Sequence, residues 1–174
     1  MKNRTLRQIT AAGVIAAAYA ALSLVLASTT FGPVQCRVSE ALTLLPVLSP
    51  AAVWGVTLGC AITNGVGAAT GANFLGLIDL FVGTAATLLA AITSRLLGKI
   101  RFGGVPWLSA LPPILFNAVA IGAEWCYAAT GSINVAFWVF AGQIALGQLP
   151  PCLLGVWLIH LLERRGLQNI IEGK

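Results

Sequence analysis

The sequence predicts an all-α integral membrane protein, a bundle of six transmembrane helices with both termini in the cytoplasm. Its 174 residues are 58% hydrophobic and 9% charged, whereas a soluble domain carries about 25% charged residues. The mean hydropathy is +0.91, so the chain lacks the polar side chains needed to cover a water-exposed surface. Long apolar runs alternate with breaks rich in glycine and proline. We expect one membrane domain, residues 1–174, located in the cell membrane.

Six apolar segments follow one another along the chain. We expect helices over residues 9–30, 37–48, 51–69, 75–97, 106–128 and 134–163. About 20 residues cross the hydrocarbon core of a bilayer, so the segment over 37–48 is short for a span. One tilted helix over 37–69 is the alternative.

The first apolar segment is interpreted as a retained helix. Basic residues precede it, and Val25-Leu26-Ala27 resembles the cleavage site of a secretory signal, which is the alternative. The segment is long enough to span, and it repeats small residues every four positions at Ala12, Ala16 and Ala20. A face of small residues lets another helix approach closely.

The basic residues decide between five and six spans, because loops rich in lysine and arginine stay in the cytoplasm. Only an even number of spans puts both termini and the loop after the fourth segment on one side. Six spans therefore place these residues in the cytoplasm: Lys2, Arg4, Arg7, Arg95, Lys99, Arg101, Arg164, Arg165 and Lys174. Arg37 is then the one basic residue left on the outer side, which indicates a role other than topology.

The six-span topology brings the polar residues of the apolar segments to one depth. All of them fall in the outer half of the membrane, at Arg37, Glu40, Asn64, Asp79, Asn117, Glu124 and Gln143. Ionisable groups in hydrocarbon are costly and mark functional sites by default. A channel needs polar groups through the full thickness, whereas the inner half here is apolar. The pattern therefore predicts a cup that is open to the outside.

The composition of this cup indicates the kind of ligand. Three carboxylates face one guanidinium, which favours a cation or a ligand rich in N–H donors. Trp125 and Trp138 are candidates to stack on a flat ligand, although an aromatic belt at the headgroups is the alternative for each.

Other chemistries find little support in the sequence. The four cysteines lack metal-site spacing, so we expect no metal; a disulfide between Cys36 and Cys126 is an open possibility. Gly98-Lys99 is not followed by serine or threonine, so no P-loop is present and ATP-driven work has to come from a partner. No cofactor and no nucleic-acid partner are expected. An intramembrane enzyme using Glu40 and Asp79, or a scaffold bundle, are the alternatives of a different class.

Four stretches of the sequence resemble the QueT family. They are the run FGPVQCRVSEALTLLP over 31–46, Asn64 ahead of a glycine-rich turn, GLID over 76–79 leading to GTAAT over 83–87, and PPILFNA over 112–118. The family comprises substrate-binding components of energy-coupling factor transporters for queuosine precursors.

The resemblance implies a six-helix component that binds a 7-deazaguanine, such as the 7-aminomethyl compound or queuine, from outside. It implies that a transmembrane coupling protein and two ATPases drive uptake, with Ala12, Ala16 and Ala20 docking on the coupling protein. A guanine-like edge and an aminomethyl group both suit an acidic cup. Another vitamin or purine-like base is the alternative ligand.

The chain departs from the family pattern at two positions. The residue before Arg37 is commonly aromatic and here is Cys36, and the position of Gln143 commonly holds a glutamate. Loss of a carboxylate at Gln143 weakens a contact to a cation, so these positions bear on which ligand is bound.

Overall fold

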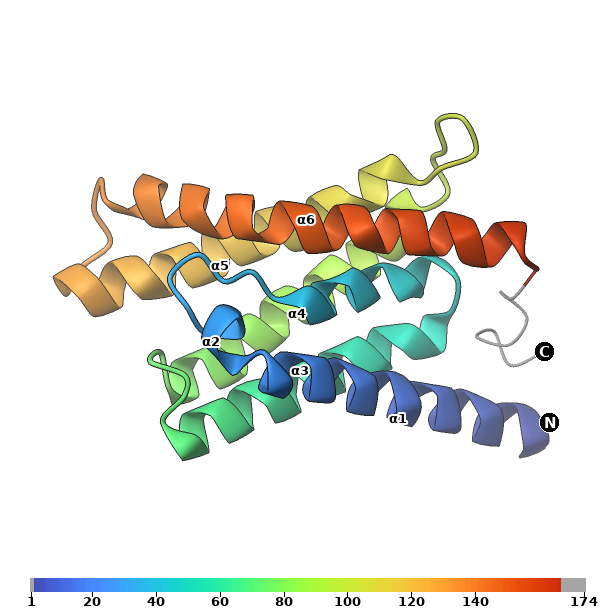
Figure 1. Ribbon diagram of the computed structural model, residues 1–174, viewed down its shortest axis with the longest axis horizontal. Helices are drawn as coiled ribbons and strands as arrows, with labels where there is room; N and C mark the ends of the chain where they lie inside the picture. The colour runs from blue at the N-terminus through green and yellow to red at the C-terminus, as the bar shows by residue number, and fades with distance from the viewer. Residues whose placement is uncertain (1, 167–174) are drawn as a thin grey trace.

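The chain folds into a bundle of helices in the computed structural model, which describes residues 2–166 (Figure 1). Its elements are α1 (Lys2–Val25), α2 (Ala27–Thr30), the 3₁₀ helix η1 (Val38–Val47), α3 (Pro50–Thr70), α4 (Leu77–Leu97), the 3₁₀ helix η2 (Trp107–Ala110), α5 (Leu111–Thr130) and α6 (Phe137–Arg164). Over these described residues the only β pairing is an isolated bridge between Phe102 and Val105. The predicted all-helical fold is therefore confirmed.

Five helices are long and apolar enough to cross a membrane. These helices are Arg4–Val25, Pro50–Thr70, Leu77–Leu97, Trp107–Thr130 and Phe137–Arg164. The segment that we expected as the second span forms η1, a 3₁₀ helix of 10 residues. A 3₁₀ helix is narrower than an α-helix and rises faster per residue, so it fits where an α-helix of the same sequence would not.

The close approach of α6 and a proline within η1 are consistent with the narrow 3₁₀ form of this helix. Pro46 lies within it and has no N–H to donate. On α6, a Cβ added at Gly155 would stand 2.5 Å from the backbone oxygen of Ala41, and one at Gly147 would overlap the backbone oxygen of Val34. The glycines of α6 therefore allow the segment that contains η1 to pass backbone against backbone.

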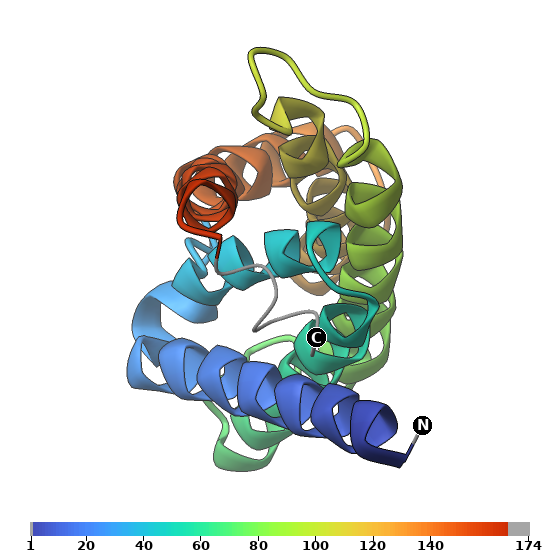
Figure 2. The same ribbon diagram turned by 90° about the vertical axis from the view of Figure 1, so that its right-hand side faces the viewer.

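The five long helices surround η1 on several sides. Along the chain, α3 packs on α1 and α4, and α5 packs on α4 and α6, while η1 contacts α1, α3, α4 and α6. The end-on view shows η1 inside this open ring of helices (Figure 2). Residues of η1 are consequently buried, although it has no more than half as many residues as each of these helices. The ring positions the first turn of η1 at the centre of the molecule.

The contact between α1 and α3 depends on two glycines. A Cβ added at Gly59 would stand 2.7 Å from Cβ of Tyr19 and 2.9 Å from the backbone oxygen of Ala16. Gly55 lies one turn earlier and meets Ile15 in the same way, at 2.8 Å. The two helices therefore pack at short range, as small residues allow in membranes.

This contact covers the residues of α1 that we expected to dock on a partner. Ala16 is 2% exposed and Ala20 is 7% exposed, and Ala12 is half-buried. They are occupied because α3 covers them within the same chain. The exposed small residues of α1 include Gly13, Ala17 and Ala21, which follow one another every four positions.

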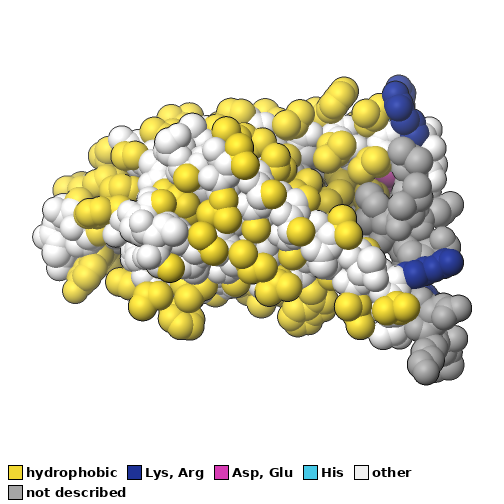
Figure 3. Space-filling model, turned by 60° about the horizontal axis from the view of Figure 1, so that its bottom comes forward, with side chains coloured by type: hydrophobic (Ala, Val, Ile, Leu, Met, Phe, Trp, Pro, Cys, Tyr) yellow, Lys and Arg dark blue, Asp and Glu magenta, His cyan; other side chains and the backbone are white. Residues whose placement is uncertain are grey.

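One end of the bundle gathers the basic residues. The start of α1 and the end of α6 lie at the same end (Figure 1), and the dark-blue basic side chains visible in Figure 3 lie at that end of an otherwise largely apolar flank. Arg101 forms a bidentate pair with Glu163 at 2.5 and 2.7 Å, which raises the pKa of Arg101. Arg95 donates to the backbone oxygen of Pro46 at 2.8 Å. Lys174 lies outside the described residues.

Buried apolar side chains fill the half of the bundle nearest this basic end. They come from the second half of η1, the start of α3 and the end of α6, and include Leu44, Val56, Cys152, Val156 and Ile159. Since the buried charged residues lie on the other half of these antiparallel helices, polar and apolar cores are separated along the bundle axis.

Candidate functional site

Arg37 is the centre of a buried polar cluster. It is 3% exposed, and its guanidinium donates to Asn64 Oδ1 at 3.2 Å and to Cys60 Sγ at 3.6 Å. The same group lies 4.0 Å from Asp79 Oδ2, and above the ring of Phe31 at 5.8 Å from the centroid. Arg37 thus connects η1 to α3 and α4.

A turn before η1 directs Arg37 into the bundle. Gln35 has a φ of 47°, a conformation that is uncommon for residues other than glycine. Its carbonyl accepts from the N–H of Arg37 at 2.9 Å and from Nε2 of Gln148 on α6 at 3.3 Å. The strained turn is therefore supported from two sides, as expected where backbone strain serves a site.

Glu40 follows Arg37 by one turn of η1 and is 1% exposed. Tyr19 of α1 donates its hydroxyl to Glu40 Oε1 at 2.6 Å, and Asn117 of α5 lies beside the same carboxylate. The other oxygen, Oε2, is buried without a hydrogen-bond partner. Glu40 is held firmly on one side and keeps a free acceptor on the other.

Asp79 shows the same half-satisfied pattern. Asn73 donates to Asp79 Oδ2 at 2.7 Å, and Asn64 Nδ2 donates to the backbone oxygen of Asp79 at 2.9 Å. Oδ1 is buried and has no partner. The loop before α4 fixes this geometry, because Asn73 Oδ1 accepts from the N–H of Leu75 at 3.1 Å in a local turn.

Glu124 is the third carboxylate of the site, on α5. It is 9% exposed, and neither of its side-chain oxygens has a hydrogen-bond partner. It is close enough to interact electrostatically with Asp79 and Arg37. Nearly all buried polar groups in proteins are hydrogen-bonded, so acceptors left free on three neighbouring carboxylates indicate a site for a ligand with N–H donors.

The predicted aromatic residues divide into two groups. Trp125 stacks between Phe74 and Phe140, at centroid distances of 5.5 and 6.4 Å, and its buried Nε1 has no partner. Trp138 is 73% exposed and packs edge-on against Phe137. The structure therefore packs Trp125 inside an aromatic stack and leaves Trp138 on the surface.

Gln143 lies one turn after Phe140 on α6. It is half-buried, and its Oε1 has no partner. The structure thus gathers most of the predicted site residues from η1, α3, α4 and α5 and keeps Gln143 at the α6 side of the aromatic stack.

Several site residues escaped the sequence reasoning. Tyr19, Cys60, Gln35 and Gln148 all contact the cluster. Tyr19 carried a usable signal, because it is the only tyrosine in an alanine-rich helix and lies on the same face as Ala16. Gln35 and Gln148 had none, since their contact depends on a turn and on tertiary packing.

The cysteines do not form the disulfide that the sequence left open. All four are free thiols, and Cys126 donates to the backbone oxygen of Ser132 at 3.4 Å. Cys60 instead accepts from Thr87 at 3.2 Å and from Arg37. Among residues 2–166, no group of three or more metal-binding side chains is present.

A bundle with five helices able to cross a membrane and a buried polar cluster between them is consistent with a membrane transporter of a small molecule. The chain belongs to the QueT transporter family, whose profile matches residues 9–164. The match confirms the family that the sequence resembles, and with it the role in membrane transport. No curated protein and no solved structure matches the chain.

Proposed function

We propose that this protein is the substrate-binding component of an energy-coupling factor transporter that takes up a queuosine precursor. The ligand would be a 7-deazaguanine such as the 7-aminomethyl compound or queuine. The observation that carries the proposal is the set of free, buried acceptors on Glu40, Asp79 and Glu124 beside one arginine. A guanine-like edge offers adjacent N–H donors, which a carboxylate accepts with charge-assisted hydrogen bonds.

The proposal includes six membrane passes with the basic end in the cytoplasm. A 10-residue 3₁₀ helix extends about 20 Å, and extended residues on either side add to it, so η1 with its flanks approaches the about 30 Å of a hydrocarbon core. Its burial among four helices supports this pass, because no backbone of η1 needs to face lipid. The gathering of basic residues at one end supports the orientation. The polar cluster then lies in the outer half of the membrane.

Uptake would depend on a transmembrane coupling protein and two ATPases, because the sequence has no P-loop of its own. The exposed small residues of α1, at Gly13, Ala17 and Ala21, are the face that we propose for docking. A bulky substitution there, Ala17→Leu, should abolish uptake in cells and leave ligand binding by the isolated protein intact. Normal uptake by Ala17→Leu would contradict the docking face.

Binding by the purified chain tests the ligand class. We expect saturable binding of 7-deazaguanines that is followed by tryptophan fluorescence, with Trp125 as the reporter because it stacks on Phe74, which lies at the edge of the pocket that Glu124 lines. Trp125→Phe should remove the signal. Recovery of unchanged ligand by mass spectrometry would exclude an enzyme that converts it. Failure to bind any nitrogen heterocycle would rule out the proposal.

Carboxylate variants test the site itself. Glu40→Gln and Asp79→Asn keep the shape and remove the charge, and each should weaken binding by about tenfold to hundredfold. Glu163→Gln is the matched control, because Glu163 pairs with Arg101 at the basic end. A scaffold bundle predicts no change in any variant, and an equal loss in all of them would point to general destabilisation.

A glycine next to Asp79 gives an independent test of the geometry. A Cβ added at Gly83 would overlap Asp79 Oδ1 and stand 2.9 Å from Asn64 Nδ2. Gly83→Ala should therefore displace the carboxylate and weaken binding. Gly65→Ala is the control, because its Cβ would meet only Leu80, at an ordinary 3.8 Å.

A further inference from the structure

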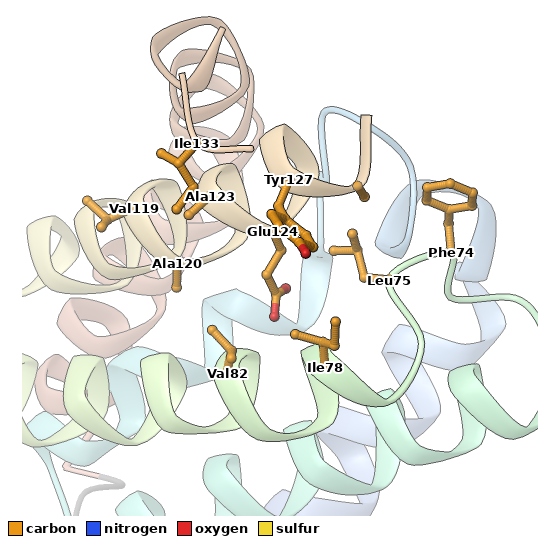
Figure 4. Close-up of a pocket in the computed structure, with 11 residues that line it drawn as sticks. Phe74, Leu75, Ile78, Val82, Val119, Ala120, Ala123, Glu124, Tyr127 and Ile133 are labelled. Carbon is orange, nitrogen blue, oxygen red and sulfur yellow. The ribbon is translucent and has the colours of Figure 1, made fainter. Parts of the chain in front are cut away.

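A pocket of about 560 Å³ lies between α4 and α5 next to the polar cluster (Figure 4). Its walls are Ile78 and Val82 of α4 and Ala120, Ala123 and Tyr127 of α5, with Phe74 at one edge. These groups are almost entirely apolar. Glu124 is the single residue with a carboxylate among those that line the pocket.

The carboxylate of Glu124 points into this pocket. Figure 4 shows the side chain extending from α5 toward Ile78 and Val82. Both oxygens are buried and without a partner, although a buried charge is normally paired. The two free oxygens of the carboxylate are hydrogen-bond acceptors, and a primary ammonium group has three N–H donors that can bind to them. An anion would be repelled here, and a purely apolar group would leave the carboxylate unpaired.

Glu124 also stands at the border of the central cluster. Asn117, seven residues earlier and therefore on a similar face of α5, lies beside Glu40, while Ala120, Ala123 and Tyr127 line the pocket. Glu124 interacts electrostatically with Asp79 and Arg37. A flat ligand held by the cluster can therefore extend a substituent past Glu124 into the pocket.

We infer that the pocket between α4 and α5 receives the cationic arm of the ligand, and that Glu124 is the residue that selects for this positive charge. The inference rests on the proposed function and deepens it. The acceptors of Glu40 and Asp79 serve the ring, whose N–H groups are common to all 7-deazaguanines. The arm differs from one 7-deazaguanine to another, so discrimination among them falls to Glu124 and the apolar walls around it.

Three ligands with one ring separate these roles. They are 7-deazaguanine without an arm, its 7-cyano derivative with a neutral arm, and its 7-aminomethyl derivative with a cationic arm. We expect the wild-type protein to bind the aminomethyl compound about tenfold to hundredfold more tightly than the cyano compound. Glu124→Gln should reduce that ratio to about one, as expected when a charge-assisted contact is lost. Asp79→Asn should weaken the binding of both compounds and preserve the ratio of their affinities.

A second variant tests the pocket without touching its charge. Ala123→Leu places a larger side chain in the space between α4 and α5. It should weaken the affinity for the aminomethyl compound by about tenfold or more. The affinity for 7-deazaguanine without an arm should stay at the wild-type value, because that ligand does not enter the pocket. If Glu124→Gln does not fold, Ala123→Leu and the wild-type preference for the aminomethyl over the cyano compound together test whether the pocket receives the arm.

The outcomes distinguish the inference from the function on which it rests. If no 7-deazaguanine binds the wild-type protein, the proposed function fails. If all three bind with similar affinity, or if Glu124→Gln keeps the preference for the aminomethyl compound, the proposed function stands and the role of Glu124 is overturned.

Discussion

Replacing Tyr19 by phenylalanine removes the hydroxyl group that donates a buried hydrogen bond to Glu40. The Tyr19 hydroxyl donates to Glu40 Oε1 at 2.6 Å, and both residues are almost fully buried. Oε2 of the same carboxylate already lacks a partner. Tyr19→Phe therefore removes the short hydrogen bond that Glu40 Oε1 accepts, within buried surroundings where Oε2 has no partner to compensate.

The size of the effect follows from the charge of the acceptor. A hydrogen bond to a charged group contributes about 1.5–3 kcal/mol, and a buried group that loses its partner also bears its desolvation penalty. The ring of Tyr19 keeps its contacts with α3, because phenylalanine has the same ring. For a chain of this length each kcal/mol shifts the melting temperature by about 2–4 °C. We expect Tyr19→Phe to lower it by about 3–12 °C.

Thermal unfolding in detergent measures this shift, and the chain supplies a matched control. Tyr127 is 58% exposed, so Tyr127→Phe makes the same chemical change outside the buried network. Its melting temperature should stay within about 1 °C of the wild type. A double-mutant cycle with Glu40→Gln should give a coupling energy of about 1–2 kcal/mol. Equal shifts for the two tyrosine variants, or a coupling energy near zero, would refute the reasoning.

Two further changes test the packing and the basic end. Gly147→Ala should destabilise the protein by about 1–3 kcal/mol, because its Cβ would overlap the backbone oxygen of Val34; Gly142→Ala, with no atom within 4 Å of its Cβ, should be neutral or stabilising in the same unfolding assay. Glu163→Gln breaks the partly exposed pair with Arg101 and should cost less than about 1 kcal/mol. That small cost should vanish at high salt, and a cost that persists there would show that the pair is more than a surface contact.

The sequence predicted the long helices well because their signal is local. A run of about 20 apolar residues is visible in composition alone, and the ends of α3 and α5 coincide with Gly71 and Gly131, which adopt left-handed conformations there. The form of η1 was not predictable in this way. It depends on Gly147 and Gly155 of α6, more than a hundred positions along the chain, which allow backbones to meet.

The candidate site was predictable to the extent that charge in a membrane is conspicuous. Arg37, Glu40 and Asp79 are anomalies in any apolar sequence, and the structure gathers them within one cluster. The individual contacts were not predictable, because a tyrosine or a glutamine in a helix has many roles. The burial of Ala16 and Ala20 was not predictable for a related reason: the small residues of α1 meet the glycines of α3 within the chain.

The separation of polar and apolar cores bears on how a ligand could cross. The half of the bundle beyond Glu40 is closed by fully buried side chains such as Leu44, Val56 and Ile159, whereas a conducting path needs polar groups through the whole thickness. A ligand held by the carboxylates therefore cannot pass while the helices keep this arrangement. Under the proposed function, its release on the basic side would require α1, α3, α4 or α6 to move relative to η1, which contacts all four. That movement disrupts buried hydrogen bonds such as the one from Tyr19 to Glu40, so it needs free energy from outside the bundle, and this is the step that the proposed partner subunits would drive.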